Sequence, residues 1–226
     1  MTASTERVIL SWSGGKDSAL ALEELRGDQH YLIMALLTTV TEGYDRVSMH
    51  GIRVSLIRRQ AEAIGIPLET VLIPQSASND EYESRMRKIL TRAQADGVTA
   101  VAFGDVFLED VRRYREEKLA QVGMKGLFPL WKKNTIDVAR KFVESGYRAI
   151  LTCVDSHHLD RSFVGREFDE RLLSDLPRDV DPCGENGEFH TFVYDGPILR
   201  TPISVRKGDV VFRETRFWYC DLAEIS

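Results

Sequence analysis

A short loop near the start of the chain has the residue types that bind phosphate. It reads Ser13, Gly14, Gly15, Lys16, Asp17 and Ser18, and it joins an apolar run at residues 8–10 to a helical pattern that starts at residue 18. Adjacent glycines let the backbone approach an anion closely, and a helix N-terminus offers unpaired N–H groups with a partial positive charge. The loop lacks the GxxxxGK[ST] spacing of a Walker A loop. It therefore predicts a phosphate site of another kind, the alternative being a plain turn in which Asp17 or Ser18 caps the helix.

A second group of reactive side chains lies at residues 181–193, which read Asp-Pro-Cys-Gly-Glu-Asn-Gly-Glu-Phe-His-Thr-Phe-Val. The Asn-Gly pair in this segment is typical of a tight turn between two strands. Such turns are usually solvated, so two glutamates and a histidine beside an apolar strand indicate a site. Glu188 is the first candidate for substrate positioning or acid–base chemistry, followed by Glu185 and His190. In the alternative interpretation, Glu185 lies on the surface and His190 is an ordinary hairpin residue.

The phosphate loop, placed after a buried strand, matches the loop of the N-type ATP pyrophosphatases. Residues 50–53, 60–67, 103–105, 126–131 and 183–193 extend the likeness, and over residues 9–197 the chain resembles the diphthine–ammonia ligase family. This resemblance implies an α/β fold of the adenine nucleotide α-hydrolase (HUP) type. It also implies that ATP and Mg²⁺ are used to convert a carboxylate into an acyl-adenylate, from which ammonia displaces AMP. The products would be an amide, AMP and pyrophosphate.

The resemblance also implies roles for particular residues. Lys16, Asp17, Glu185, Glu188 and His190 would be catalytic, with Asp17 also a Mg²⁺ ligand and Lys16 a positive charge for the departing pyrophosphate. The nucleotide would be bound by Ser11, Ser13, Gly14, Gly15, Lys16, Asp17, Ser18, Leu37, Thr38, His50, Arg53, Phe103, Gly104, Asp105 and Arg115. Leu37, Thr38 and Phe103 would lie near the base, at the carboxyl ends of strands. For Leu37 and Phe103, ordinary strand packing is an equal alternative.

Several charged residues have a structural alternative as well. His50 and Arg53 come just before a helix, where either one can simply be solvated. The run at residues 112–118 is by default a solvated helix face with near-neighbour ion pairs, from which only Arg115 and Glu117 are retained, as an Arg-x-Glu pair found in relatives. His157 and His158, with Asp155 and Asp160 nearby, suggest a polar turn more than a metal site, because adjacent histidines project in different directions. Asp155 and Ser156 remain possible substrate contacts.

One position departs from the family pattern. True diphthine ligases tend to read Gly-Glu-Gly-Gly-Glu-Tyr-Glu-Thr, whereas this chain places His190 where they carry an acid. An imidazole changes both the charge and the hydrogen-bond polarity of the site, which leaves the substrate open. The expected partners are ATP and a carboxylate-bearing substrate, for which a protein-borne and a corrinoid-related carboxylate are both left open.

Two other function classes are weighed against the ligase. A tRNA-modifying ATP pyrophosphatase would usually carry paired catalytic cysteines or a basic RNA-binding extension. This chain has a net charge of −5, and Cys153, Cys183 and Cys220 are widely separated, as expected for reduced thiols in a cytoplasmic protein. A non-catalytic adenine-nucleotide-binding module is the third class, and it would not need the glutamates and histidine of residues 185–190. Nucleic-acid and membrane partners are not expected, and a homodimer is left open.

The elements that position these residues follow from periodicity. Buried strands are predicted at residues 8–10, 31–40, 68–73, 98–103 and 149–154, alternating with amphipathic helices at 18–25, 54–64, 80–95, 109–122 and 135–143. Glycines at 27, 65, 97 and 146 follow the helices. This alternation predicts an α/β fold with a parallel sheet and helices on both faces. An ATP-binding domain is expected at residues 1–155. A smaller α+β lobe is expected at residues 156–226, with a helix at 165–173 and strands towards residues 210–219.

Overall fold

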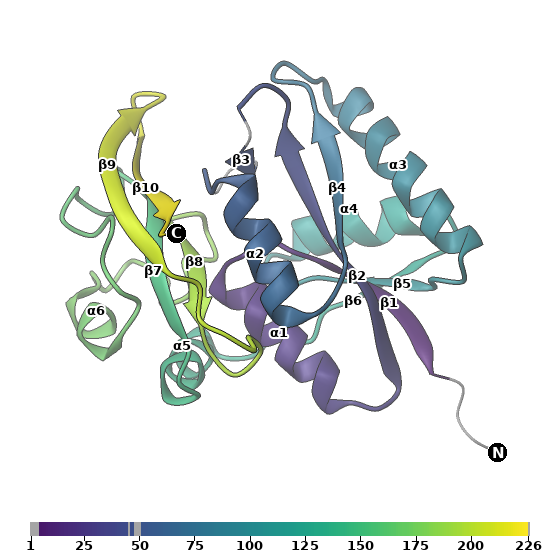
Figure 1. The fold of residues 1–226 in the computed structure, drawn as a ribbon, viewed down its shortest axis with the longest axis horizontal. Coiled ribbons are helices and arrows are strands. Elements are labelled where there is room, and N and C mark those ends of the chain that lie inside the picture. The colour runs from purple at the N-terminus through teal and green to yellow at the C-terminus, as the bar shows by residue number, and fades with distance from the viewer. Residues whose placement is uncertain (1–4, 45, 48–50, 226) are drawn as a thin grey trace.

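The computed structural model describes residues 5–44, 46–47 and 51–225. Its larger sheet contains β1 (Glu6–Ser11), β2 (Tyr31–Thr41), β3 (Arg46–Val47), β4 (Leu68–Ile73), β5 (Ala100–Ala102) and β6 (Lys125–Leu127) (Figure 1). The strands run in the order β3-β2-β1-β5-β6. β1 and β3 pair with different parts of one edge of β2, and β4 pairs with the opposite edge. All of these pairings are parallel except that of β3 with β2. The carboxyl ends of the parallel strands therefore meet at one edge, where ligands bind in open α/β sheets.

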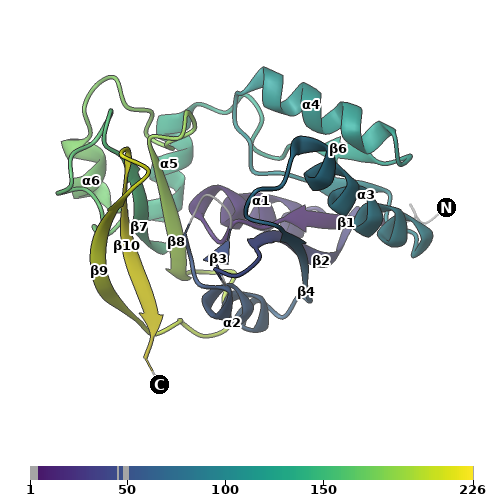
Figure 2. The same ribbon diagram turned by 90° about the horizontal axis from the view of Figure 1, so that it is seen from above.

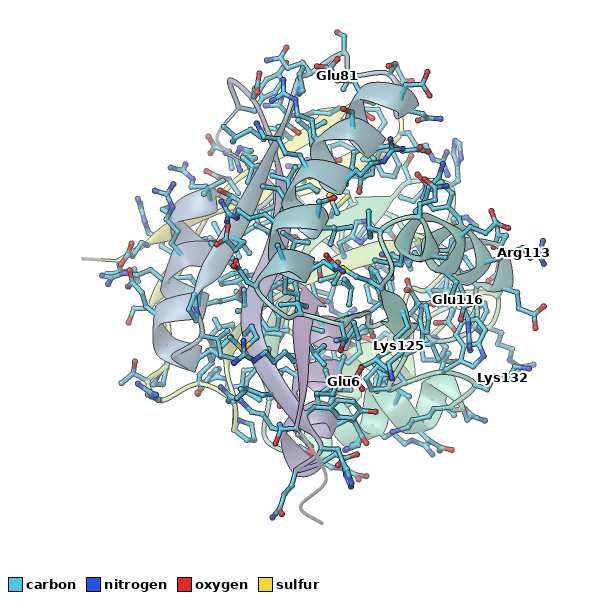
Figure 3. The ribbon with its side chains drawn as sticks, turned by 90° about the vertical axis from the view of Figure 1, so that its right-hand side faces the viewer. Glu6, Glu81, Arg113, Glu116, Lys125 and Lys132 are labelled. Atoms are coloured by element: carbon cyan, nitrogen blue, oxygen red, sulfur yellow. The ribbon has the colours of Figure 1, made fainter. Side chains whose placement is uncertain are left out.

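Helices cover both faces of this sheet. α1 (Lys16–Gly27) and α2 (Val54–Ile64) lie on the face towards the second sheet, and α3 (Asn79–Ala95) and α4 (Glu109–Ala120) lie on the other (Figure 2). The core is split accordingly, because Leu36 of β2 packs with α1 and α2 while its neighbour Leu37 packs with α3 and α4. The outer faces of the helices are charged. Arg113 and Glu116 of α4 point outward in Figure 3, where the Lys125–Glu6 ion pair, with an N–O distance of 3.0 Å, is also visible.

The second sheet is antiparallel. It has the order β8-β7-β10-β9, formed by β7 (Arg148–Asp155), β8 (Phe189–Asp195), β9 (Val205–Arg213) and β10 (Phe217–Glu224). α5 (Thr135–Glu144) and α6 (Glu170–Asp175) accompany it. The prediction for β7 is wrong in one respect, because this strand was expected in the parallel sheet and instead pairs antiparallel with β8 and β10. A division after residue 155 would separate β7 from the strands it pairs with.

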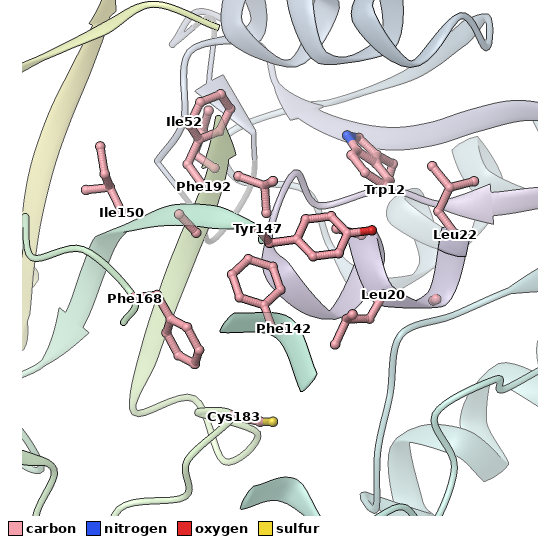
Figure 4. Close-up of a cluster of buried hydrophobic side chains, with 14 of the residues drawn as sticks. Trp12, Leu20, Leu22, Ile52, Phe142, Tyr147, Ile150, Phe168, Cys183 and Phe192 are labelled. Atoms are coloured by element: carbon pink, nitrogen blue, oxygen red, sulfur yellow. The ribbon is translucent and has the colours of Figure 1, made fainter. Parts of the chain in front are cut away.

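One apolar core joins the two sheets. Phe142 of α5 is fully buried and stacks on Tyr147 with ring centroids 4.9 Å apart, and it lies perpendicular to the Phe168 ring with centroids 5.4 Å apart. The same cluster includes Leu20 of α1 and Phe192 of β8 (Figure 4). Because α1 is packed from both sides, the loop that begins it is held in a fixed position relative to the second sheet.

The architecture expected from the sequence is otherwise confirmed as an α/β fold with helices on both faces and a C-terminal lobe. The helix expected at residues 165–173 is the main exception. Gly165 has a φ of +80°, which is outside the helical region, and helix α6 begins later, where the Asp169 carboxylate accepts a hydrogen bond from the Leu172 amide at 2.7 Å. Within the described ranges, no helix is both long enough and apolar enough to cross a membrane.

Candidate functional site

The phosphate loop at residues 13–18 turns directly from β1 into α1. Gly14 has a φ of +80°, and Gly15 is the N-cap residue of α1, so the N-cap residue itself has no side chain to accept from the first turn. The Ser13 hydroxyl lies 3.2 Å from that of Ser18 and accepts a hydrogen bond from the Gly15 amide at 3.3 Å. The loop therefore presents a helix N-terminus flanked by two hydroxyl groups, an arrangement suited to binding an anion.

β8 of the second sheet lies directly against this loop. The Thr191 hydroxyl accepts a hydrogen bond from the Lys16 amide at 3.1 Å, and the Val193 amide donates to the Gly14 carbonyl at 2.9 Å. A Cβ atom on Gly15 would lie 3.0 Å from the Thr191 carbonyl oxygen. Glycine at this position therefore lets β8 approach the loop closely.

The Lys16 side chain also reaches the second lobe. Its ammonium group lies 2.8 Å from both carboxylate oxygens of Asp17, donates to the Cys183 carbonyl, and lies 5.5 Å from the centre of the Phe189 ring. Burial alone would lower the pKa of Lys16, but the negative charge of Asp17 raises it above its usual value. Lys16 therefore stays charged and links the loop to the segment that precedes β8.

Glu185 reaches in the opposite direction, from the second lobe to the loop between β5 and α4. Its Oε1 atom accepts hydrogen bonds from the Val106 amide at 2.7 Å and the Phe107 amide at 3.3 Å. Burial raises the pKa of Glu185 to about 7, with the Asp17 charge adding to the effect and the two amides opposing it. A carboxyl group with this pKa can either accept or donate a proton near neutral pH.

Glu188 has a different environment from Glu185. It is 1% exposed, and its oxygens accept hydrogen bonds from the Asp181 amide at 3.1 Å, the Asn186 amide at 3.0 Å and the Asn186 side chain at 2.9 Å. These donors all belong to the loop that Glu188 ends. The structure thus directs Glu188 into its own loop, and it is not among the residues that line the cavity described below.

A cavity lies between the phosphate loop and the second lobe. It is lined by Ser11, Ser13, Gly15, Lys16, Asp17, Ser18, Phe103, Gly104, Asp105, Arg115, Cys183, Gly184, Glu185, Gly187, Phe189, His190 and Thr191. We call it the phosphate-side cavity. His190 thus faces the same space as the loop, and burial lowers the pKa of its imidazole to about 4, helped by the Lys16 charge. The imidazole is therefore neutral at pH 7.

A cleft continues from this cavity across the carboxyl ends of β1 and β2. Its lining includes Ser11, Ser13, Leu37, Thr38, Phe103 and Arg115, and we call it the base-side cleft. The Thr38 side chain is nearly fully buried, and its hydroxyl has no hydrogen-bond partner among the described residues. Buried polar groups are rarely left unsatisfied, so this hydroxyl points to a ligand in the cleft.

Phe103 and Arg115 form the wall shared by the cavity and the cleft. The Arg115 guanidinium lies 4.2 Å from the centre of the Phe103 ring, and its Nε atom is 3.0 Å from Asp105 Oδ2. Burial raises the pKa of Asp105, although Arg115 opposes this. Gly104 lets the β5–α4 loop pack against the start of α1, because a Cβ atom there would lie 2.8 Å from the Asp17 backbone carbon. The β5–α4 loop is thus held against the start of α1.

Comparisons with known proteins identify the family of this chain. The model of the diphthamide synthase N-terminal domain matches residues 6–126, and that of the C-terminal domain matches residues 134–224. The chain belongs to the diphthamide synthase family. The diphthine–ammonia ligases of Mus musculus and Homo sapiens are each 26% identical to it, over 91% of this chain and 85% of their own lengths. That of Schizosaccharomyces pombe is 27% identical over 88% of this chain and 36% of its own length.

Some of the expected site residues lie elsewhere in this member of the diphthamide synthase family. Arg53 precedes α2 and forms an ion pair with Asp221 of β10 at 2.5 Å, so its guanidinium is engaged with the second sheet instead of the phosphate loop. Glu117 is exposed on α4. His50 lies outside the described residues. Asp155 is buried against Arg216, with an N–O distance of 2.5 Å, and His157 and His158 lie in a turn as expected.

The described residues contain no preformed group of three or more metal-binding side chains. This is compatible with Mg²⁺, which is usually bound by one or two carboxylates together with substrate phosphates. The Asp17 side chain is 29% exposed and lines the phosphate-side cavity, and the charges of Asp105 and Asp181 act in the same region. Asp17, with Asp105 beside it, therefore fits a cation that is bound together with phosphate.

One buried side chain that joins the phosphate loop to the second lobe was not predicted from the sequence. Gln60 of α2 is fully buried and is hydrogen-bonded to both the phosphate loop and β8. Its signal was present in the sequence, because Gln60 falls three residues after Ile57 and four before Ile64, on the apolar stripe of an amphipathic helix. A polar residue on such a stripe needs buried partners.

Proposed function

We propose that this chain is an ATP-dependent carbon–nitrogen ligase that converts a carboxylate into an amide and releases AMP and pyrophosphate. One observation carries the proposal: the phosphate loop and the residues Glu185 and His190 of the second lobe line a single cavity. The relatives' name, diphthine–ammonia ligase, supports the same chemistry. ATP would lie with its terminal phosphates on the loop and its base in the base-side cleft.

In the first step, the substrate carboxylate attacks the α-phosphorus of ATP. The bond from this phosphorus to the oxygen that bridges the α and β phosphates breaks, and pyrophosphate leaves. The loop amides and the hydroxyls of Ser13 and Ser18 would bind this leaving group, because they are already arranged around the helix N-terminus. Mg²⁺ held at Asp17 would supply further neutralisation of the phosphate charge.

In the second step, the nitrogen of ammonia attacks the acyl carbon, and the bond from that carbon to the AMP oxygen breaks. The attacking nitrogen must lose a proton. Glu185 is the group we assign to accept it, because it lies in the cavity and its pKa of about 7 suits proton transfer near neutral pH. Neutral His190 would contact the substrate as a hydrogen-bonding group without adding charge.

The substrate is assigned only as a carboxylate. Where we expect relatives to have an acid, this chain has an imidazole that is neutral at pH 7, which favours a substrate without a positive charge near that position. Thiol chemistry of the tRNA-modifying kind is not favoured, because burial raises the pKa values of both Cys153 and Cys183 to about 12.

The test is to follow ATP labelled in the α-phosphate with the purified chain, Mg²⁺ and ammonium chloride, in the presence and absence of a diphthine-bearing elongation factor or other carboxylates. We expect labelled AMP and an equal amount of pyrophosphate. Formation of ADP and inorganic phosphate instead would overturn the α–β cleavage. Tight binding of ATP with no turnover on any carboxylate would favour a nucleotide-binding module.

A further inference from the structure

The Gln60 side chain connects the phosphate loop to β8. Its Oε1 atom accepts a hydrogen bond from the Trp12 indole at 2.9 Å. Its Nε2 atom donates to the Gly14 carbonyl at 2.9 Å and to the Val193 carbonyl at 2.6 Å. All of the hydrogen-bonding capacity of the amide nitrogen is thus used by two carbonyls, one from each lobe.

The chemistry of the partners fixes the orientation of this amide. An indole N–H can only donate, so it must face the amide oxygen, while backbone carbonyls can only accept, so they must face the amide nitrogen. A glutamate at this position would place negative charge against two carbonyls, and an aliphatic side chain would take one hydrogen-bond partner away from each of three buried polar groups. Glutamine fits this site in both shape and polarity.

The loop backbone packs directly onto this amide. A Cβ atom on Gly14 would lie 2.8 Å from Gln60 Oε1 and 2.5 Å from the Ile57 side chain. The Gly14 carbonyl also accepts a hydrogen bond from the Val193 amide at 2.9 Å. Two donors therefore hold one carbonyl of the phosphate loop, and one of them also binds β8, the strand that carries His190 and Thr191.

We propose that Gln60 is a positioning residue that fixes the phosphate loop and β8 in the relative arrangement needed to bind ATP. This inference rests on the proposed function. The loop must keep its amides directed at the phosphates without reorganising when ATP binds, and a buried amide with rigid partners provides that preorganisation. Gln60 itself does not line the cavity, so it acts only through Gly14 and Val193.

The experiment compares Gln60→Met with Ile64→Val, a buried control on the same helix, one turn further from the loop. Binding of ATP with Mg²⁺ and of inorganic pyrophosphate is measured by calorimetry, well below the unfolding temperature of each protein. We expect Gln60→Met to weaken both affinities roughly tenfold, because the loop loses its preorganisation, and Ile64→Val to leave them unchanged. Equal effects of the two variants, or no effect of Gln60→Met, would overturn the inference.

Hydrogen exchange gives a readout that does not depend on the ligand. Without ATP, Gln60→Met should speed exchange at the Val193 amide and in residues 14–18 more than Ile64→Val does, and uniform changes in the two variants would count against positioning. If Gln60→Met does not fold, Gln60→Glu repeats the comparison, because it keeps the volume and the acceptor for Trp12. If the unmodified chain binds neither ATP nor pyrophosphate, the proposed function fails, and the exchange comparison still decides whether Gln60 holds the loop.

Discussion

The carboxylate of Glu185 accepts a hydrogen bond from the Val106 amide at 2.7 Å, which joins the second lobe to the loop between β5 and α4. Lys16 makes the converse link, from α1 to the Cys183 carbonyl. Both contacts border the phosphate-side cavity, so its walls are held together by groups that also carry charge. Changes in the charge of these groups should therefore affect stability as well as chemistry.

Glu185 should make stability depend on pH. Its pKa in the folded protein is about 7, above the ordinary 4.5, so between these values the folded state binds more protons than the unfolded chain. Its contribution is therefore fully present below pH 4.5 and is lost as the pH rises through about 7. Denaturation at several pH values should show the unmodified protein losing stability relative to Glu185→Gln across this range.

The control for this prediction is Glu117→Gln, which changes an exposed carboxylate on α4. Its stability difference from the unmodified protein should stay nearly constant over the same range. If the stability difference between Glu185→Gln and the unmodified protein were also constant with pH, it would contradict the pKa of about 7 for Glu185. If Glu185 accepts the proton from ammonia, amide formation should also rise with pH through about 7 in the unmodified protein and be strongly reduced in Glu185→Gln.

Lys16→Met should destabilise the fold and also stop ATP cleavage. The substitution leaves the Asp17 carboxylate without its partner and removes the hydrogen bond to the Cys183 carbonyl. Removing one member of a buried ion pair costs about 3–5 kcal/mol, and we expect the lower end because Asp17 is 29% exposed. Chemical denaturation measures the loss. A variant as stable as the unmodified protein would show that the link between the lobes contributes little.

Glu188→Gln should affect stability more than nucleotide binding. Glu188 is directed into its own loop, where it accepts hydrogen bonds from Asp181 and Asn186, two of which come from backbone amides. Bonds to a charged acceptor are worth about 1.5–3 kcal/mol each, and an amide retains only some of them, so we expect a loss of about 1–3 kcal/mol. Calorimetry should find ATP affinity within about twofold of the unmodified protein, because Glu188 does not line the phosphate-side cavity. A much larger loss of ATP affinity would show that Glu188 contributes to the nucleotide site.

The sequence predicts the strand–turn–helix geometry at residues 8–25 well because the signal is local. The buried strand, paired glycines and helix are contiguous, so their geometry follows from neighbouring residues. The approach of Thr191 to Lys16 joins residues 175 positions apart, and nothing in the local pattern reports it. The assignment of β7 failed for a related reason. Its residues are buried along most of their length, and a strand buried on both faces has the same apolar pattern in a parallel or an antiparallel sheet.

The two glutamates beside the turn show the same limit on a smaller scale. Alternation along a strand would place Glu185 and Glu188 on opposite faces, but it cannot say which faces the cavity. The turn also interrupts the alternation, because Gly184 and Gly187 have φ values of +67° and +89°. The direction of each carboxylate is then decided by its backbone donors, at Val106 for Glu185 and at Asp181 and Asn186 for Glu188.

Gly104→Ala should weaken ATP binding through a clash. The new methyl group would lie 2.8 Å from the Asp17 backbone carbon and 3.0 Å from the Ser18 amide nitrogen, which forces the β5–α4 loop away from the start of α1. Gly27→Ala is the matched control, because a Cβ atom there has no neighbour within 4 Å. Calorimetric titration should find that Gly104→Ala binds ATP roughly tenfold or more weakly than Gly27→Ala. Equal affinities would show that the contact between the β5–α4 loop and α1 can accommodate the methyl group.

Thr38→Val should separate stability from ligand binding. The Thr38 hydroxyl is buried without a partner, so replacing it with a methyl group of similar size removes a desolvated polar atom and should leave stability unchanged or increase it. If the hydroxyl contacts ATP in the base-side cleft, the same change should weaken ATP binding about fivefold to tenfold, the value of one hydrogen bond. Thr38→Ser keeps the hydroxyl and should retain most of the affinity. Binding of inorganic pyrophosphate, which would lie on the phosphate loop and not in the base-side cleft, should be the same in all three proteins. Equal losses for ATP and pyrophosphate would mean that Thr38 acts through the fold of the loop and not through the nucleotide.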